Sequence, residues 1–323
     1  MPRRWYQTLE IDGVEQVFED VKRADSKFWN EGKWDTFIAP LLPEERNTFI
    51  EIGCNAGLFL NKAREASFER VIGIECNKQI FQQAEIYREH VGGDWELKNE
   101  CIRDDFFIDK YPLADVVLIS NTHYYMPVHV FARLVDRLRN HCLYCIVVSA
   151  RAKRRQGNAA WDWNHLHGYF TDWEKINSVA GINPDGDPTP RDTMYSVIFK
   201  SNLVALDVDA IYDPWMKASE NENHKSHELA PALEDFLQKV LNGDDFELKD
   251  TAFFNYWMKR ESKRGEEWVL KWLEYKADTA RDIQKNGMKT PYYFGKNNKT
   301  LDGLHRLCTV KQLGHKHIIS RVI

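Results

Sequence analysis

The chain has 323 residues, of which 43% are hydrophobic and 29% charged, and its formal net charge at pH 7 is −5. This composition is ordinary for a globular protein and excludes a chain that stays disordered, while the negative charge argues against a surface built throughout for nucleic acid. The first twenty residues lack the apolar core of a signal peptide, and no run of eighteen apolar residues is present. We therefore expect a cytoplasmic protein without a membrane span, and the length predicts two domains or one domain with large additions.

Six cysteines are scattered along the chain and do not form the dense pattern of a disulfide framework. Cys142 and Cys145 form a C-x-x-C pair, but no second Cys/His pair follows at the spacing of a zinc site. The pair runs into the apolar stretch IVVSA. We interpret both residues as reduced thiols near the start of a strand and expect no metal site; metal or redox chemistry of the pair is the alternative.

Short apolar, β-branched runs alternate with longer helical patterns from residue 46 to about residue 150, which is typical of a parallel sheet covered by helices. The expected strands are 47–53, 70–75, 114–120 and 142–150, with a weaker one at 95–98, and the expected helices are 58–66, 78–90 and 128–140.

Beyond residue 150 the regular alternation stops at a basic, aromatic stretch and the turn-rich segment INPDGDPTPRD. The runs MYSVIFK and LVALDVDAI flank Ser201-Asn202 and predict a hairpin that closes the sheet. A boundary is expected near Tyr212-Asp213-Pro214, which gives predicted domains at about 1–210 and 211–323. Two later segments, LAPALEDFLQKVLNG and GEEWVLKWLEYKADTARDIQ, have apolar residues at helical spacing and predict core helices.

The most informative segment is TFIEIGCNAGLFL, in which an expected strand leads through a glycine turn into an expected helix. Gly53 and Gly57 allow a tight turn and a close approach of the backbone to a ligand, and the following helix directs its N-terminal amides to the same place. A dinucleotide fingerprint requires G-x-G-x-x-G, and Asn55 and Leu58 stand where its further glycines would fall. The segment therefore disfavours NAD and FAD.

The spacing E-x-G-x-x-x-G, from Glu51 to Gly57, resembles motif I of the class I S-adenosylmethionine-dependent methyltransferases. The resemblance covers residues 46–150 closely and 1–210 loosely. It implies an α/β fold with a Rossmann-like, doubly wound, mostly parallel sheet. It also implies a loop around the amino-acid end of the cofactor, with Glu51 contacting the ammonium.

Further polar residues follow the other expected strands. Glu75 lies 24 residues after Glu51, a separation that suits one helix and one strand, and a carboxylate there can accept both ribose hydroxyls. In the same family an acid after the third strand commonly meets the adenine amino group, and Asp104 and Asp105 are the candidates; each is equally compatible with a helix cap or a solvated position. The predicted cofactor-binding residues are Glu51, Gly53, Asn55, Gly57, Glu75, Asp104, Asp105 and Asn121.

The methyl acceptor is expected beside the ends of the fourth and fifth strands, where ligands bind in open α/β sheets. His123 follows the fourth strand and is a candidate catalytic base, since its ordinary pKa is near 6.5; an equally open interpretation is a histidine packing the pocket wall. Tyr124 and three arginines after the fifth strand, Arg151, Arg154 and Arg155, are candidate substrate-binding residues. A solvated basic loop, with its aromatic neighbours packed on the sheet, is the alternative.

Ahead of the first strand, KFWNEGKWDTFIAPLL predicts an amphipathic helix with Trp29 and Trp34. In the same family such an element often forms a lid over cofactor and substrate. Ordinary packing against the sheet is the alternative.

The last fifty residues contain the turn Asp302-Gly303-Leu304-His305-Arg306, followed by a helix and by L-G before a closing strand. This pattern resembles the ParB/sulfiredoxin-like fold, a second, smaller α+β domain. A glycine turn at a helix N-terminus with a fixed cation suits phosphate, so the resemblance implies a second phosphate site at Asp302, Gly303, His305 and Arg306 that accepts ATP or CTP. Leu304 stands where sulfiredoxins have their reactive cysteine, and a degenerate, structural module is the alternative.

The leading functional hypothesis is methyl transfer from S-adenosylmethionine to an oxygen or phosphate of a small-molecule, glycan or phosphorylated acceptor. Three alternatives stay open: a nucleic-acid methyltransferase, a bifunctional kinase-methyltransferase, and a non-catalytic cofactor-sensing scaffold. Ser120-Asn121-Thr122-His123 replaces the N/D-P-P-Y/F motif of amino-methylating DNA enzymes, which disfavours DNA but leaves RNA open.

Overall fold

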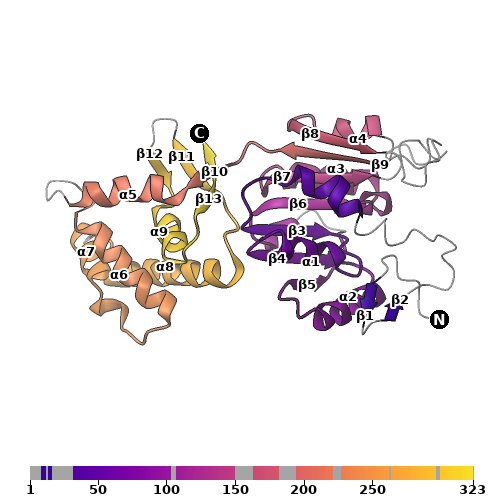
Figure 1. Ribbon diagram of the computed structural model, residues 1–323. Coiled ribbons are helices and arrows are strands. Elements are labelled where there is room, and N and C mark those ends of the chain that lie inside the picture. The colour runs from indigo at the N-terminus through magenta and orange to yellow at the C-terminus, as the bar shows by residue number, and fades with distance from the viewer. Residues whose placement is uncertain are drawn as a thin grey trace. The chain divides into compact units, whose positions relative to one another are not determined.

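The computed structural model describes residues 9–11, 14–16, 32–102, 107–149, 163–181, 194–220, 227–261, 263–295 and 299–322. The chain forms two compact units (Figure 1). Unit 1 comprises residues 1–110 and 114–202, and unit 2 comprises residues 111–113 and 203–323.

Unit 1 is built on a seven-stranded sheet in the order β5-β4-β3-β6-β7-β9-β8. Its strands are β3 (Thr48–Ile52), β4 (Arg70–Glu75), β5 (Glu96–Asn99), β6 (Ala114–Ser120), β7 (Cys142–Ser149), β8 (Glu174–Gly181) and β9 (Met194–Lys200). The first five strands of this order pair in parallel, while β9 is antiparallel to both β7 and β8. The sheet is therefore mixed and mostly parallel, as the sequence predicts.

The strand order reverses between β3 and β6. From β3 the chain runs outward through β4 and β5, then returns to the other side of β3 to form β6 and β7. In open α/β sheets, ligands bind outside the carboxyl ends of the strands at such a reversal. The loops after β3 and β6 are therefore the first place to look for a site.

Helices follow the strands of unit 1, and the first three of them lie where the sequence predicts them. They are α1 (Leu58–Glu65), α2 (Lys78–His90), α3 (Val128–Leu138) and α4 (Trp163–Tyr169), with short 3₁₀ turns η4 (Ile108–Lys110) and η5 (Thr122–Tyr125) and a separate ribbon of β1 (Leu9–Ile11) and β2 (Val14–Gln16). The ends of α1, α2 and α3 lie within two residues of the predicted ends. The expected strands up to β7 and the helices between them are thus confirmed.

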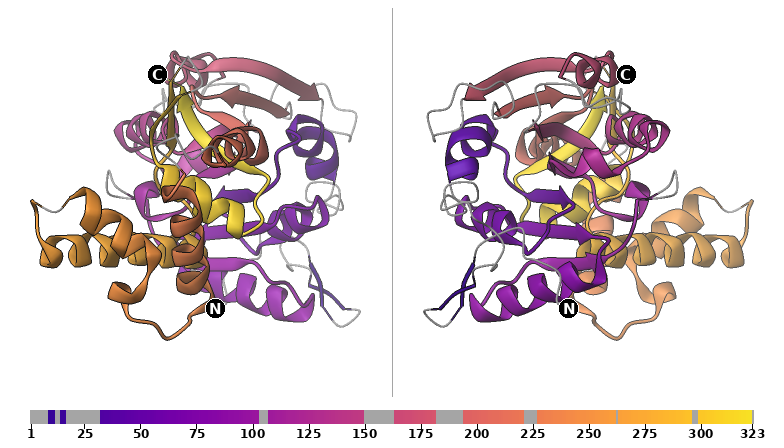
Figure 2. Two further views of the ribbon diagram at one scale, coloured as in Figure 1. Left: turned by 90° about the vertical axis from the view of Figure 1, so that its left-hand side faces the viewer. Right: turned by 90° about the vertical axis from the view of Figure 1, so that its right-hand side faces the viewer.

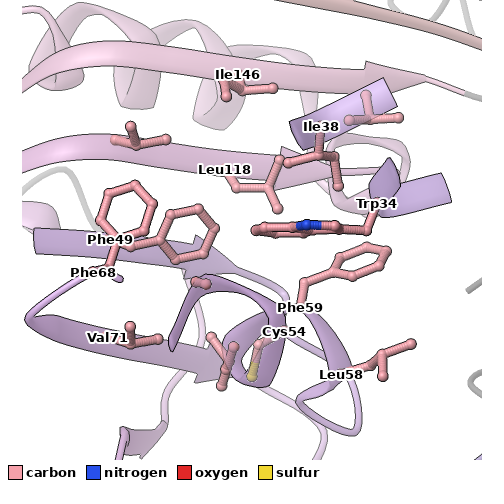
Figure 3. Close-up of a cluster of buried hydrophobic side chains, with 14 of the residues drawn as sticks. Trp34, Ile38, Phe49, Cys54, Leu58, Phe59, Phe68, Val71, Leu118 and Ile146 are labelled. Atoms are coloured by element: carbon pink, nitrogen blue, oxygen red, sulfur yellow. The ribbon is translucent and has the colours of Figure 1, made fainter. Parts of the chain in front are cut away.

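The segment ahead of β3 is packed on the sheet. It forms a π-helical turn η2 (Trp34–Ile38) and a 3₁₀ turn η3 (Ala39–Leu41), not one continuous helix. Trp34 is 4% exposed, its ring 5.9 Å from that of Phe59 and 6.2 Å from that of Phe49; Figure 3 shows it beside Phe59 and Leu118. Packing is therefore confirmed for Trp34, whereas Trp29 lies outside the described residues.

The C-x-x-C pair lies within β7. Cys142 and Cys145 are completely buried and free, and Cys142 Sγ donates to Leu138 O at 3.4 Å. Because they are three residues apart on a strand, they face opposite sides of the sheet. Burial raises the pKa of both thiols, which confirms the interpretation of reduced structural cysteines.

The predicted hairpin between residues 194–200 and 203–211 is wrong. The hairpin partner of β9 is β8, and the following strand β10 (Val204–Asp207) pairs antiparallel with β13 (His317–Val322) of unit 2. The two runs are adjacent in sequence and equally β-like, but β9 already has partners on both edges, β7 and β8, so it offers no edge for a further strand.

Unit 2 contains a four-stranded sheet in the order β10-β13-β11-β12. Its other strands are β11 (Tyr292–Gly295) and β12 (Lys299–Asp302), and its helices are α5 (Val208–Ser219), α6 (Leu229–Asn242), α7 (Ala252–Arg260), α8 (Glu266–Asn286) and α9 (Leu304–Gln312), with a 3₁₀ turn η7 (Leu248–Asp250). β11 is parallel to β13 and antiparallel to β12. Helix α9 lies beside the strands at the yellow end of the colour scale (Figure 2), where Leu307 and Cys308 share a buried cluster with Tyr292 and Ile318.

The expected boundary at Tyr212-Asp213-Pro214 falls inside helix α5, so the two units divide earlier, at Asn202. The start of α5 is fixed by Asp207, whose side chain accepts from the amide of Ala210. Pro214 is accommodated within the helix. The two later apolar segments form α6 and α8 and bury Leu237 and Leu273 in the core of unit 2, as predicted.

Among the described residues, no helix combines the length and the apolar character needed to cross a lipid bilayer.

Candidate functional site

The turn after β3 has an unusual backbone. Gly53, Asn55 and Gly57 have φ values of +77°, +53° and +90°, so three of five consecutive residues are left-handed. This conformation is unstrained for glycine and rare for other residues. The turn brings the chain from β3 into α1, whose N-cap residue is Gly57.

Position 53 requires a glycine for two reasons: the backbone is left-handed there, and a neighbouring residue leaves no space for a side chain. A Cβ atom at this position would lie 2.2 Å from Thr122 Oγ1, closer than any real contact. Thr122 follows β6, and its hydroxyl donates to Ser120 O at 3.2 Å. Gly53 therefore lets the loops after β3 and β6 approach each other at the reversal of strand order, a role that the sequence did not reveal.

The amides of the turn are all hydrogen-bonded within unit 1. Those of Gly53 and Cys54 donate to Ile74 O at 2.7 and 3.1 Å, and that of Gly57 donates to Cys54 O at 3.0 Å. The amide of Ala56 donates to Asn55 Oδ1 at 2.8 Å, and that of Asn55 to Glu75 Oε2 at 3.1 Å. A phosphate-binding loop directs such amides at its ligand. This turn does not, which agrees with the sequence pattern that disfavours a dinucleotide.

Glu51 lies at the end of β3, directly before the turn, and is 1% exposed. Its Oε2 atom is buried without a hydrogen-bond partner among the described residues. Burial raises the pKa of Glu51 to about 8; positive Lys33 opposes this shift and negative Glu75 adds to it. An unsatisfied buried carboxylate oxygen costs free energy that a cation or a hydrogen-bond donor would recover.

Glu75, at the end of β4, is 9% exposed and holds the turn in place. Its Oε1 accepts from the amide of Asn77 at 2.8 Å, and its Oε2 from that of Asn55. Burial raises the pKa of Glu75, while the backbone amides act in the opposite direction. A carboxylate has about four acceptor positions, so both oxygens retain the capacity to accept hydroxyl groups.

The loop after β6 contains the expected acceptor-side residues. Asn121 is left-handed, with φ of +58°, and its amide donates to Val148 O at 2.9 Å. His123 is 1% exposed, and its ring lies 5.9 Å from that of Phe131. Of the two interpretations of His123, this burial favours the pocket-wall residue, because a base must reach the proton that it removes.

Several predicted residues are not among those whose side chains are described. Asp104, Asp105, Arg151, Arg154 and Arg155 lie outside the described residues, as does the side chain of Tyr124. Of the aromatic residues that follow the arginines, Phe170 stacks on Phe199 with ring centroids 4.0 Å apart. That aromatic side chain packs on the sheet.

Sequence reasoning missed Lys33. This lysine is 8% exposed, and its Nζ lies 5.4 Å from the centroid of the Phe59 ring, in the first turn of α1. Burial lowers the pKa of Lys33 to about 8, which Glu51 partly opposes. A signal was present in GKWDTFI, since Lys33 and Phe37 are spaced to share the apolar face of a helix, where a lysine is unusual.

The predicted second site in unit 2 has the expected backbone, but the side chains of His305 and Arg306 are engaged internally, and that of Asp302 is not among those described. Gly303 has φ of +107° and directly precedes α9. Arg306 Nη1 donates to Thr290 O and Pro291 O at 3.2 and 3.1 Å, and His305 Nε2 lies 3.1 Å from Lys276 O. These contacts tie the turn to α8 and to the segment just before β11, and they favour the structural alternative for this module.

The chain matches no family model and no curated protein. Similar solved structures include PH0226 protein from Pyrococcus horikoshii OT3, which is 13% identical, with 53% of this chain and 90% of that chain covered and a TM-score of 0.43. The N-methyltransferase NodS from Bradyrhizobium japonicum WM9 is 14% identical, with 56% and 98% covered and a TM-score of 0.42. Magnesium protoporphyrin IX methyltransferase from Synechocystis PCC 6803, crystallised with SAM, is 10% identical, with 48% and 70% covered and a TM-score of 0.38. Likeness at this level adds no evidence on activity, which has to be argued from the site itself.

Proposed function

We propose that unit 1 binds S-adenosylmethionine and transfers its methyl group to an oxygen or phosphate of a small-molecule or glycan acceptor. The domain that does so corresponds to the predicted 1–210, ending at residue 202 where unit 1 ends. The mixed, mostly parallel sheet is consistent with a Rossmann-like methyltransferase fold.

The observation that supports this most directly is the chemistry of the turn after β3. Its amides are already hydrogen-bonded, while the acid beside it, Glu51, has a buried oxygen without a partner. A turn whose own amides are already taken and that has a carboxyl group beside it suits a cationic group better than a phosphate. The amino-acid end of S-adenosylmethionine carries an ammonium and is flanked by a sulfonium.

The neighbouring acid fits the remainder of the same ligand. Glu75 ends the strand next to β3, and its carboxylate retains acceptor positions for the two ribose hydroxyls. Methyl transfer from a sulfonium is an in-line displacement, so the main task of the chain is to align the acceptor. The loop after β6, which contacts the turn through Thr122 and Gly53, is the element placed to do this.

Calorimetric titration of the full chain with S-adenosylmethionine, S-adenosylhomocysteine and NAD tests this proposal. We expect the first two to bind and NAD not to bind. Glu51→Gln should lower the affinity for S-adenosylmethionine about 10- to 100-fold, because a charge-assisted contact worth roughly 1.5–3 kcal/mol is lost. The matched control is Glu65→Gln, an exposed change at the end of α1 whose affinity should equal that of the wild type.

Transfer of a labelled methyl group to a panel of glycans, phosphorylated small molecules and RNA then separates the acceptor classes. Transfer to RNA alone would support the nucleic-acid alternative, and binding without transfer to any member would support a cofactor-sensing scaffold. Tight binding of NAD in place of the methyl donor would contradict the proposal.

A further inference from the structure

Lys33 is a buried cation at the proposed donor site. It immediately precedes η2, is 8% exposed, and lies with its Nζ 5.4 Å from the ring of Phe59. Phe59 is the second residue of α1, directly after the glycine turn. The ammonium therefore lies close to the first turn of α1.

Glu51 and Lys33 interact electrostatically, but no hydrogen bond or ion pair joins their side chains. The positive charge of Lys33 lowers the pKa of Glu51, and the negative charge of Glu51 raises that of Lys33. No hydrogen bond or ion pair joins the side chain of Lys33 to another residue in the part of the chain that the structure describes, and Glu51 Oε2 also lacks a partner there. Two ionisable groups of opposite charge type thus interact electrostatically, and each has capacity for another partner.

Burying such groups is costly unless each one meets a counter-charge or a hydrogen bond. The amino-acid end of S-adenosylmethionine presents one ammonium and one carboxylate on the same carbon. A pair of protein charges of opposite sign is the complement of that zwitterion. Glu51 is already assigned to the ammonium of the ligand. The groups left without a partner are the carboxylate of the ligand and the ammonium of Lys33.

We propose that Lys33 binds the carboxylate of the methyl donor and so selects a donor with an intact amino-acid end. This inference rests on the proposed function. It assigns a residue ahead of β3 to the site and gives the segment 32–38 a role in binding as well as in packing.

The simpler alternative is that Lys33 only offsets the charge of Glu51. In that case removing the lysine charge would lower the affinity for every ligand that contacts Glu51, whether or not the ligand has a carboxylate. The two roles therefore differ in one measurable quantity, the preference of the protein for S-adenosylmethionine over its decarboxylated form, which keeps the amine, the sulfonium and the adenosine.

The experiment measures dissociation constants for both ligands with the full chain, by calorimetry, in the wild type, Lys33→Gln and Lys33→Met. We expect the wild type to prefer S-adenosylmethionine by about 10- to 100-fold, and each variant to lower that preference to within about threefold of unity. Because the result is a ratio within one preparation, a partly unfolded variant still reports it. Lys62→Gln, the same change at a partly exposed lysine of α1, is the matched control and should keep the wild-type preference.

An unchanged preference in both Lys33 variants would overturn the inference and leave the proposed function standing. Equal loss of both ligands would also overturn it, in favour of charge compensation at Glu51. Failure of the wild type to bind either ligand would overturn the proposed function and this inference with it.

Discussion

Each unit places a left-handed glycine at the start of a helix, Gly57 before α1 and Gly303 before α9, but the charged side chains beside the two turns are used differently. In unit 1 the adjacent acid, Glu51, keeps a buried oxygen without a partner among the described residues. In unit 2 the adjacent cation, Arg306, donates to two backbone carbonyls. Two turns of similar sequence character thus differ in whether their charges remain available for a ligand.

The comparison teaches that a glycine turn at a helix N-terminus is a ligand site only if its neighbours are left unsatisfied by the fold. Where the neighbours bond to the chain, the same turn stabilises the structure. Changes near the unit 1 turn should therefore alter both binding and pH dependence, whereas changes near the unit 2 turn should alter stability alone.

The largest expected effect is the pH dependence of unit 1. The pKa of Glu51 is raised from 4.5 to about 8, so its contribution to stability is fully present below about pH 4.5 and is lost as the pH rises to about 8. The full loss is about 5 kcal/mol. Lys33, with its pKa lowered to about 8, acts only at higher pH: it contributes stability above about pH 10.5 that is lost as the pH falls to about 8.

Thermal unfolding of the wild type and Glu51→Gln at pH 5, 6.5 and 8 checks this. The two proteins should melt within a few degrees of each other at pH 5, and the variant should become progressively more stable than the wild type towards pH 8. A difference in melting temperature that stays the same at all three pH values would mean that Glu51 ionises normally and has a partner in solution.

The second effect is structural, at Gly53. Gly53→Ala should lower the free energy of unfolding by about 2–4 kcal/mol, because alanine is strained in a left-handed backbone and its Cβ would overlap Thr122. Donor affinity should fall with it, since the loops after β3 and β6 must separate. Denaturant unfolding measures the free energy of unfolding, and calorimetric titration measures the donor affinity.

Gly92→Ala is the matched control for Gly53. Gly92 also lies in unit 1 and has φ of +62°, but a Cβ there would meet nothing within 4 Å. The control should cost only about 1–2 kcal/mol, the price of the backbone angle, and leave donor affinity unchanged. Equal effects at the two positions would contradict the role given to Thr122.

The smallest effect is expected in unit 2. Arg306→Ala removes the hydrogen bonds to Thr290 O and Pro291 O and should lower stability by about 1–2 kcal/mol, while the affinity for S-adenosylmethionine stays at the wild-type value. Titration of the wild type with ATP and CTP accompanies this measurement. Binding of either nucleotide that disappears in Arg306→Ala would reverse the comparison and restore a phosphate site at this turn.

Much of unit 1 was predictable because its signals are local. A parallel strand buried on both faces is a continuous apolar run, and a covering helix repeats its apolar residues every three or four positions. These patterns placed β3, α1, β4, α2 and β6 with little error, and the spacing of Glu51, Gly53 and Glu75 at strand ends placed three residues beside one another at the reversal of strand order.

What the sequence alone determined, then, is the identity of the elements and the residues that end them, since both are set by interactions between near neighbours. Only the tertiary structure decided that β10 pairs with β13, that Gly53 makes room for Thr122, and that Lys33 lies near Glu51. These contacts join residues far apart in the chain, and their energies depend on which strand edge is vacant and which charges are buried together. A short run such as VALD fits either sheet by its composition, and the fold settles the choice through the edge that β13 leaves open.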